Sequence, residues 1–185
     1  MAVLTLRRAA SLAAALLALA AAPGRAQAPP TEYQVKAVFL FNFSQFVDWP
    51  ATAFADAHSP LVICVLGDDP FGAILDEIVR GEMVNGRPLA VHRFKSVDEV
   101  DTCHIAFIGR SQTGQLDTVV AALRARSVLT VGDFEGFTRH GGIIRFVTVG
   151  NRIRLRVNLT GAQQAKLTIS SKLLRPAQIV APGED

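Results

Sequence analysis

The chain has 185 residues, with 19 Lys and Arg against 16 Asp and Glu. Half of its residues are hydrophobic and its pI is about 9.2, a basic balance that would suit a nucleic-acid-binding protein. The excess of basic over acidic residues lies entirely in residues 1–26, which contain Arg7, Arg8 and Arg25 and no acidic residue. Without that segment basic and acidic residues are equal in number, and nucleic acid is excluded as the expected partner.

Residues 1–26 have the layout of a secretory signal peptide. Two arginines form a charged region, residues 12–22 form an apolar region, and Gly24 and Ala26 supply a small-x-small cleavage site. Cleavage after Ala28 is an alternative, although the proline that follows makes that bond the poorer candidate. Since no cysteine lies near the cleavage point, a lipid anchor is not expected. We predict an exported protein with no membrane insertion after cleavage.

Residues 27–185 are long enough for one domain with a sizeable core. Its first element is a predicted helix over residues 32–50, which carries nearly half of the aromatic residues of the chain. Polar residues interrupt this segment too often for a membrane span, and Pro50 ends it.

A helix that is apolar over most of its circumference either packs inside the domain or pairs with another chain. Both interpretations stay open for this segment. The candidate partner-binding residues are Phe39, Phe43, Phe46 and Trp49.

From residue 61 onward, short apolar runs alternate with amphipathic stretches. Strands are predicted at residues 61–66, 88–94, 104–109 and 128–131. Helices are predicted with Pro70 in the first turn of one and over residues 112–126 for the other. This alternation predicts βαβ crossovers and a largely parallel sheet covered on both sides, that is, an α/β/α sandwich.

The end of the chain departs from this alternation. Residues 143–149 and 152–158 flank Gly150 and Asn151, a strong signal for a two-residue hairpin. If residue 149 pairs with residue 152, one face of the hairpin belongs to the core. A final helix is then predicted to start at Thr160 or Gly161 and to end before Arg175.

The other face of the hairpin carries four arginines, with Arg145 directly opposite Arg156 and with Arg152 and Arg154 alongside. Like charges opposed across strands are destabilising unless something negative lies over them. Carboxylates of the same domain or solvent are one explanation. An anionic ligand or the acidic surface of a partner is the other, and it makes these arginines candidate ligand-binding residues.

No pattern of catalytic or metal-binding residues is found. The four histidines show no metal-ligand spacing, no nucleophile elbow is present, and the glycines at residues 67–72 lack the lysine and hydroxyl residue of a phosphate loop. We therefore expect no enzyme activity, no metal and no cofactor.

Cys64 lies within the first predicted strand and Cys103 immediately before the third, and these two strands are commonly neighbours in a doubly wound sheet. Neighbouring strands lie about 4.8 Å apart, within reach of a disulfide. In an oxidising compartment one bridge is favoured, and two buried thiols are the alternative.

Several segments of the chain, taken in order, resemble the YfiR family of periplasmic proteins over nearly all of residues 32–180. They are the aromatic segment 32–50, Cys-Val-Leu-Gly-Asp-Asp-Pro-Phe-Gly at 64–72, Cys-His-Ile at 103–105, Gly-Gly-Ile-Ile-Arg-Phe at 141–146, Arg-Leu-Arg-Val-Asn-Leu at 154–159 and Lys-Leu-Thr-Ile-Ser-Ser-Lys-Leu-Leu at 166–174. The resemblance implies an α/β sandwich, a tendency to form homodimers, and a disulfide between Cys64 and Cys103.

The resemblance also implies a function, because the family includes a repressor of a membrane diguanylate cyclase that acts on its periplasmic part and so lowers cyclic-di-GMP signalling and biofilm formation. We therefore expect a periplasmic regulator that binds and represses a membrane sensor, either a diguanylate cyclase or a histidine kinase. A periplasmic protein that binds a small anion through the arginine face is the alternative.

The signal peptide generates the first prediction. The mature chain should begin near Gln27, because the small-x-small site ends at Ala26. Mass spectrometry of protein from a periplasmic extract checks this, and an intact N-terminus found only in the cytoplasm would contradict both export and the regulatory hypothesis.

Overall fold

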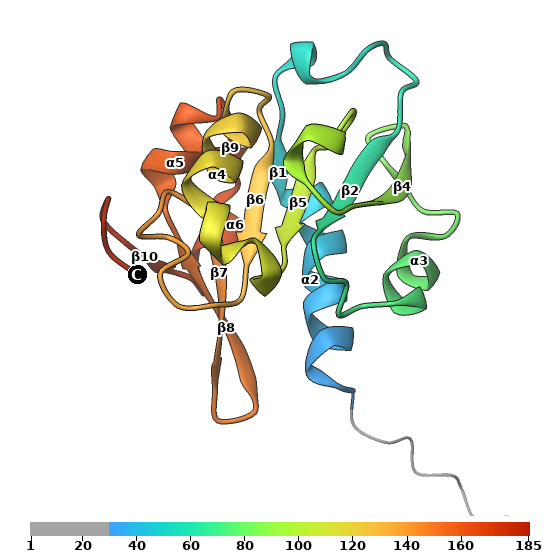
Figure 1. The fold of residues 1–185 in the computed structure, drawn as a ribbon. Helices are drawn as coiled ribbons and strands as arrows, with labels where there is room; N and C mark the ends of the chain where they lie inside the picture. Colours follow the sequence, from blue (N-terminus) through green and yellow to red (C-terminus); the bar gives the residue numbers. More distant parts are fainter. Residues whose placement is uncertain (1–29) are drawn as a thin grey trace, which may run out of the picture.

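The computed structural model describes residues 30–185; the predicted signal peptide lies outside them. Helices cover both faces of an eight-stranded sheet (Figure 1). In chain order the sheet contains β2 (Leu61–Leu66), β3 (Met83–Val84), β4 (Arg87–Phe94), β5 (Ile105–Ile108), β6 (Leu129–Gly132), β7 (Ile144–Val149), β8 (Arg152–Val157) and β10 (Gln178–Ile179). The helices are α2 (Glu32–Phe46), α3 (Ala73–Val79), α4 (Leu116–Arg124), α5 (Leu159–Gln164) and α6 (Ser171–Leu174).

The strands follow the order β10-β8-β7-β6-β5-β2-β4-β3. The five central strands are parallel to one another and lie in the order β4-β2-β5-β6-β7. β8 runs antiparallel to β7. The α/β class and the C-terminal antiparallel hairpin are therefore confirmed. The predicted hairpin register is confirmed as well, because Val149 pairs with Arg152 and Arg145 pairs with Arg156.

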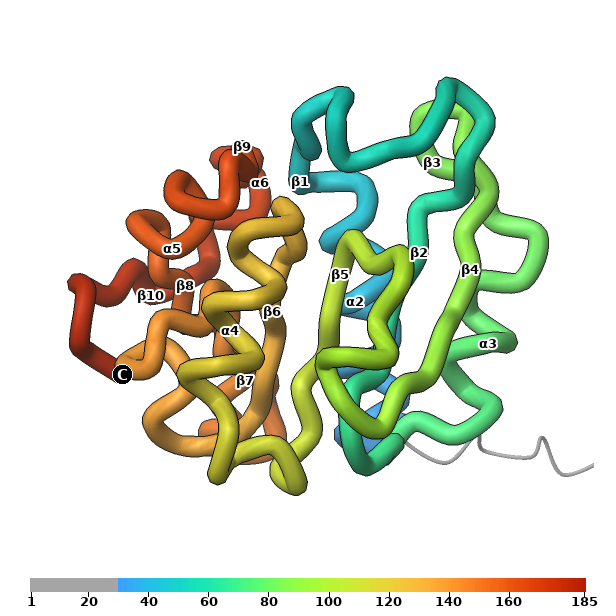
Figure 2. The backbone as a smooth tube through the Cα atoms, turned by 45° about the horizontal axis from the view of Figure 1, so that its top comes forward, coloured from blue at the N-terminus to red at the C-terminus, as the bar shows by residue number. Residues whose placement is uncertain are grey.

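The two helical layers divide the side chains of β2 between them. Ile63 and Val65 point into a core cluster shared with α2, α3, α5 and α6. Val62 and Leu66 point to the other side, into a cluster with α4. Figure 2 shows α4 on the opposite side of the sheet from α2. A strand that is buried on both faces needs an unbroken apolar sequence, which is what residues 61–66 provide.

Helix α2 is shorter than predicted. It begins with a capping box, in which the Thr31 hydroxyl accepts from the Gln34 N–H and the Gln34 side chain accepts from the Thr31 N–H. It ends at Phe46, and Trp49 lies beyond it. The next residues form β1 (Val47–Asp48), which pairs antiparallel with β9 (Thr168–Ile169). Pairing with a distant strand requires an extended backbone, which ends the helix four residues before Pro50.

The predicted C-terminal helix is also wrong as a single element. It is divided into α5 and α6 by β9, and Lys166 at the division has a φ of 59°. This left-handed conformation ends a right-handed helix. The helix predicted over residues 112–126 begins as a 3₁₀ helix, η3 (Arg110–Gln115), before α4.

The disulfide between Cys64 and Cys103 is present, and it rules out the alternative of two buried thiols. The Cα atoms of the two cysteines lie 5.8 Å apart, because β2 and β5 are neighbours as expected. The bridge joins β2 to the segment that enters β5.

His104, next to this bridge, is a buried structural residue. Its Nδ1 accepts a hydrogen bond from the Val62 N–H (3.0 Å), and its Nε2 donates to the Ala53 carbonyl oxygen (3.1 Å). The ring of Phe54 stacks on it, with centroids 4.4 Å apart. Burial lowers the pKa of His104 to about 4; the hydrogen bond to Ala53 acts in the opposite direction but does not offset it.

This environment predicts a pH-dependent stability. In the unfolded chain the imidazole binds a proton below about pH 6.5, whereas in the folded protein it stays neutral down to about pH 4. The free energy of unfolding should therefore fall by up to about 3 kcal/mol as the pH drops through this window. Urea unfolding at a series of pH values measures it.

Two variants serve as comparison. His104→Gln should be less stable at neutral pH but should lose less of its remaining stability between pH 6.5 and pH 4. His58→Gln, at an exposed histidine, should retain the wild-type dependence. If the wild type and His104→Gln lost equal stability between pH 6.5 and pH 4, the pH dependence could not be assigned to His104.

Candidate partner-binding site

The aromatic residues of α2 pack inward rather than forming an exposed patch. Phe43 is completely buried, and its ring stacks on that of Phe146 in β7 with centroids 5.8 Å apart. Phe39, Phe46 and Trp49 are partly buried against the same core. Phe43 therefore offers no surface to a partner in this structure. The alternative of a core helix describes this side of α2.

The four candidate arginines are divided into two groups. Arg145 forms an ion pair with the Asp185 carboxylate, and the Nε of Arg156 donates to the side chain of Gln178 (3.3 Å). Arg152 and Arg154 are exposed and form no side-chain hydrogen bond or ion pair within residues 30–185. The expectation that a carboxylate of the same domain covers the face is thus met at Arg145 and not at the hairpin tip.

Asp185 is held over the arginine face by three more hydrogen bonds. Its carboxylate accepts from the N–H of Gly136 (2.7 Å) and from both the N–H and the hydroxyl of Thr138. Burial acts to raise the pKa of Asp185, but these hydrogen bonds and the charge of Arg145 outweigh it, and the pKa lies below its usual value. Arg145 is consequently a structural residue.

The tip of the β7–β8 hairpin projects beyond the rest of the sheet (Figure 1). β6 pairs with β7 only at Ile144 and Arg145, and β10 pairs with β8 only at Arg156 and Val157. The outer residues of the hairpin therefore lack a neighbouring strand on either side within the described chain. Val149, beside the turn, is 59% exposed.

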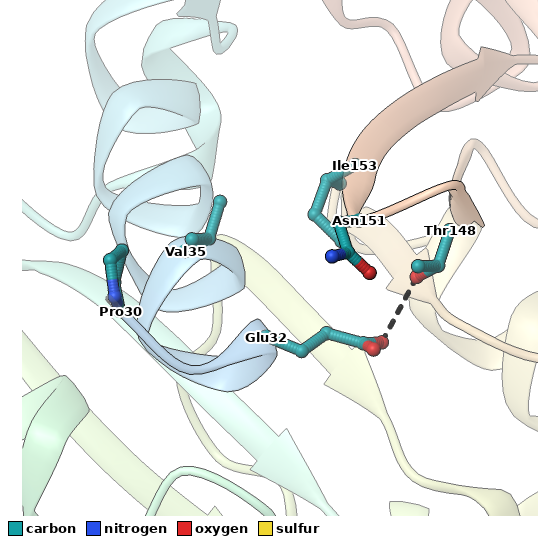
Figure 3. Close-up of a pocket in the computed structure, with 6 residues that line it drawn as sticks. All are labelled: Pro30, Glu32, Val35, Thr148, Asn151 and Ile153. Atoms are coloured by element: carbon teal, nitrogen blue, oxygen red, sulfur yellow. Dashed lines mark hydrogen bonds between the residues drawn. The ribbon is translucent and has the colours of Figure 1, made fainter. Parts of the chain in front are cut away.

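A pocket of about 390 Å³ separates this tip from the N-terminal turn of α2 (Figure 3). Val35 and Ile153 give it two apolar walls. On its floor the Glu32 carboxylate accepts a hydrogen bond from the Thr148 hydroxyl (3.1 Å), which joins helix and hairpin. Its remaining lining residues are Pro30 and Asn151.

A buried chain of charges runs from Glu32 into the interior. The Lys36 ammonium lies 2.6 Å from both Glu32 and Asp133, and the side chains of Lys36 and Asp133 are each only 3% exposed. The Tyr33 hydroxyl donates to Asp133 (3.0 Å), and Arg110 donates to its main-chain carbonyl (3.1 Å). Asp133 follows β6 directly, and the chain thus links α2 to the carboxyl ends of β5 and β6.

The electrostatic environment follows from this arrangement. The hydrogen bond from Lys36 holds the pKa of Glu32 below its usual value. Burial, together with the negative charge of Asp133, raises the pKa of Tyr33 to about 12, which keeps its hydroxyl a hydrogen-bond donor. These charges satisfy one another, and they position the helix rather than perform chemistry.

Sequence reasoning did not single out Lys36 or Asp133. Lys36 counted only as one of the polar interruptions of an apolar helix. Its spacing of four residues from Glu32 was an available signal, since a lysine on a helix that is otherwise apolar has to find a partner when the helix is buried. Asp133 follows its strand without a motif, and nothing local indicates that it meets Lys36.

Within residues 30–185, no group of three or more His, Cys, Asp or Glu residues is placed to hold a metal ion. None of the helices in this part of the chain has the length and apolar character needed to cross a membrane.

The sequence profile of the YfiR/HmsC-like family matches residues 33–178. The chain belongs to the YfiR/HmsC-like family. The match runs from α2 to β10 and includes both cysteines, the Lys36–Asp133 pair and the hairpin. A search of curated proteins finds no match. Membership of this family indicates a periplasmic regulator of cyclic-di-GMP signalling in general, with a regulatory rather than a catalytic role.

The buried charges generate a prediction for stability. Lys36→Met should lower the free energy of unfolding by about 3–5 kcal/mol, because it leaves the buried Asp133 carboxylate without its ammonium partner. Lys172→Met, at an exposed lysine, is the matched control and should change stability little. Urea unfolding measures both.

Adding Asp133→Asn to Lys36→Met should recover part of the loss, since the unpaired charge disappears. The stabilising role of the Lys36–Asp133 ion pair would be contradicted if Lys36→Met were as stable as Lys172→Met. It would also be contradicted if Asp133→Asn lowered the stability of Lys36→Met by as much as it lowers that of the wild type.

Proposed function

We propose that this member of the YfiR/HmsC-like family is exported to the periplasm, binds the periplasmic part of an inner-membrane signalling protein, and represses it. The expected target is a diguanylate cyclase, so that binding lowers cyclic-di-GMP and biofilm formation; a histidine kinase is the other kind of sensor considered. Family membership is the observation that carries the proposal.

The hairpin tip supports the proposal by offering a contact surface. It holds Arg152 and Arg154 without a carboxylate of the described chain, beside the exposed Val149. Arginine anchors next to apolar side chains are typical of the residues that dominate binding energy at interfaces. The remaining candidates on the aromatic segment, Phe39, Phe46 and Trp49, are half-buried and offer less surface.

The structure also suggests why the tip is suited to a regulatory contact. Glu32 bonds to Thr148 in the hairpin and to Lys36, which bonds to Asp133 at the end of β6. A partner that displaces the tip would disturb this chain of hydrogen bonds and would therefore shift the position of α2 on the sheet. Homodimer formation, which the family resemblance implies, is tested separately by light scattering of the purified protein.

A periplasmic small-anion-binding protein is the second candidate. The observation in its favour is the same pair of exposed guanidinium groups, which could hold phosphate or sulfate. Isothermal titration with each anion tests it. Binding that Arg152→Gln and Arg154→Gln abolish would support it, provided that regulation in cells does not depend on the same arginines.

The proposal predicts the effect of removing the protein. Deleting the gene from its own bacterium should raise cellular cyclic-di-GMP, measured by mass spectrometry of extracts. The full-length chain should restore the lower level, whereas a chain without residues 2–26 should not, because it stays in the cytoplasm. An unchanged level after deletion would refute the cyclase as the target.

The same assay tests the surface. The double variant Arg152→Glu/Arg154→Glu should fail to restore the low level, since it reverses the charge of the contact. The charge-matched control Arg80→Glu/Lys95→Glu changes two exposed residues elsewhere and should behave as wild type. If both double variants restore the level equally, the arginines are not the contact.

A further inference from the structure

Strand β8 has an open edge over residues 152–155. On one side it pairs with β7 along its full length. On the other side β10 pairs with it only at Arg156 and Val157. No strand of residues 30–185 lies beside the preceding residues on that side. An open edge presents main-chain donors and acceptors with which another chain can pair.

The hairpin register shows which groups point into this edge. Gly150 and Asn151 have φ values of 46° and 49°, as in the two-residue turn that closes on a hydrogen-bonded pair. At the far end of the ladder the Asn158 N–H donates to the Ile143 carbonyl (2.8 Å). Even-numbered residues from 152 to 158 therefore direct their main-chain groups at β7.

Odd-numbered residues of β8 direct their main-chain N–H and carbonyl groups away from β7, toward the open edge. The Val157 carbonyl confirms the alternation, because it accepts from the Val180 N–H on the β10 side (3.0 Å). The N–H and the carbonyl of Ile153 thus point into the open edge, and neither has a main-chain partner within the described chain. An added strand would continue the sheet from this residue.

The side chains along the edge indicate what such a strand contains. Arg152, Arg154 and Arg156 share one face of β8 because side chains alternate along a strand. Acidic residues on that face of an added strand would lie next to them. On the opposite face the neighbour is Ile153, half-buried at the wall of the pocket beside α2. The matching sequence alternates acidic and apolar residues.

We propose that residues 152–155 of β8 bind an extended segment of the partner, with alternating acidic and apolar side chains, by β-strand addition. This inference rests on the proposed function and names the chemistry of the contact. Main-chain hydrogen bonds to Ile153 set the register, and the arginines select the charge.

The experiment uses the mature full chain and a labelled peptide that alternates Glu and Val. A peptide of the same composition in separate Glu and Val blocks is the control, as is an alternating Lys and Val peptide. Fluorescence anisotropy should show binding of the alternating acidic peptide, weakening as salt rises. The block peptide should bind at least about tenfold more weakly, since it cannot match both faces at once.

Variants of Ile153 test the main-chain contact. Ile153→Pro removes the outward N–H and should weaken binding about tenfold relative to Ile153→Ala, which keeps it. Ile153→Val is the second control. It keeps both the outward N–H and a β-branched apolar side chain, so that this variant should bind as wild type. Circular dichroism verifies that each variant is folded.

Hydrogen exchange of the wild-type protein supplies a readout that needs no variant. Adding the alternating peptide should slow exchange of the Ile153 and Leu155 amides. Unchanged exchange at these amides, or equal binding of the block and alternating peptides, would overturn strand addition. The arginines would then serve only to keep the edge from pairing with other chains.

Failure of this inference is distinguishable from failure of the proposed function. If Ile153→Pro restores low cyclic-di-GMP in the deletion strain and exchange is unaffected by the peptide, the regulator acts through another surface. If deletion of the gene leaves cyclic-di-GMP unchanged, the proposed function fails, and the peptide measurements alone decide whether the edge binds.

Discussion

The buried ion pair between Lys36 and Asp133 determines how α2 lies on the sheet. Two charges with almost no access to water are tolerable only when each compensates the other, and the two side chains are 2.6 Å apart and nearly fully buried. The pair therefore fixes the rotation of the helix about its axis. That rotation directs Phe43 onto Phe146 and turns Val38 toward solvent.

The two ends of α2 are held by different means. At the N-terminal end, Glu32 extends the ion pair to the hairpin through Thr148. At the C-terminal end, β1 pairs with β9 and the Trp49 indole donates to the His104 carbonyl. The C-terminal end is thus anchored near His104 and the disulfide, whereas the N-terminal end lies beside the projecting tip. A contact made at the tip would therefore act on the N-terminal end.

The sequence supported some parts of the candidate site and misled on others. The hairpin register was predictable because the turn at Gly150 and Asn151 fixes which residues face each other. The role of Arg145 was not, since its partner, Asp185, lies forty residues further along the chain. The aromatic segment was ambiguous because a helix that is apolar over most of its surface has the same composition whether it meets a core or a partner.

The sequence by itself determined the α/β class, the alternation of strands with helices and the hairpin, because each depends on local periodicity or on turn chemistry. For the two cysteines it favoured a bridge and left two buried thiols as the alternative. Only the tertiary structure decided that Trp49 lies beyond the helix, that the last helix is divided by β9, and that Lys36 meets Asp133. These features depend on contacts between residues about a hundred positions apart, as for Val47 and Ile169. No local pattern encodes such contacts, since the pairing exists only after the chain has packed.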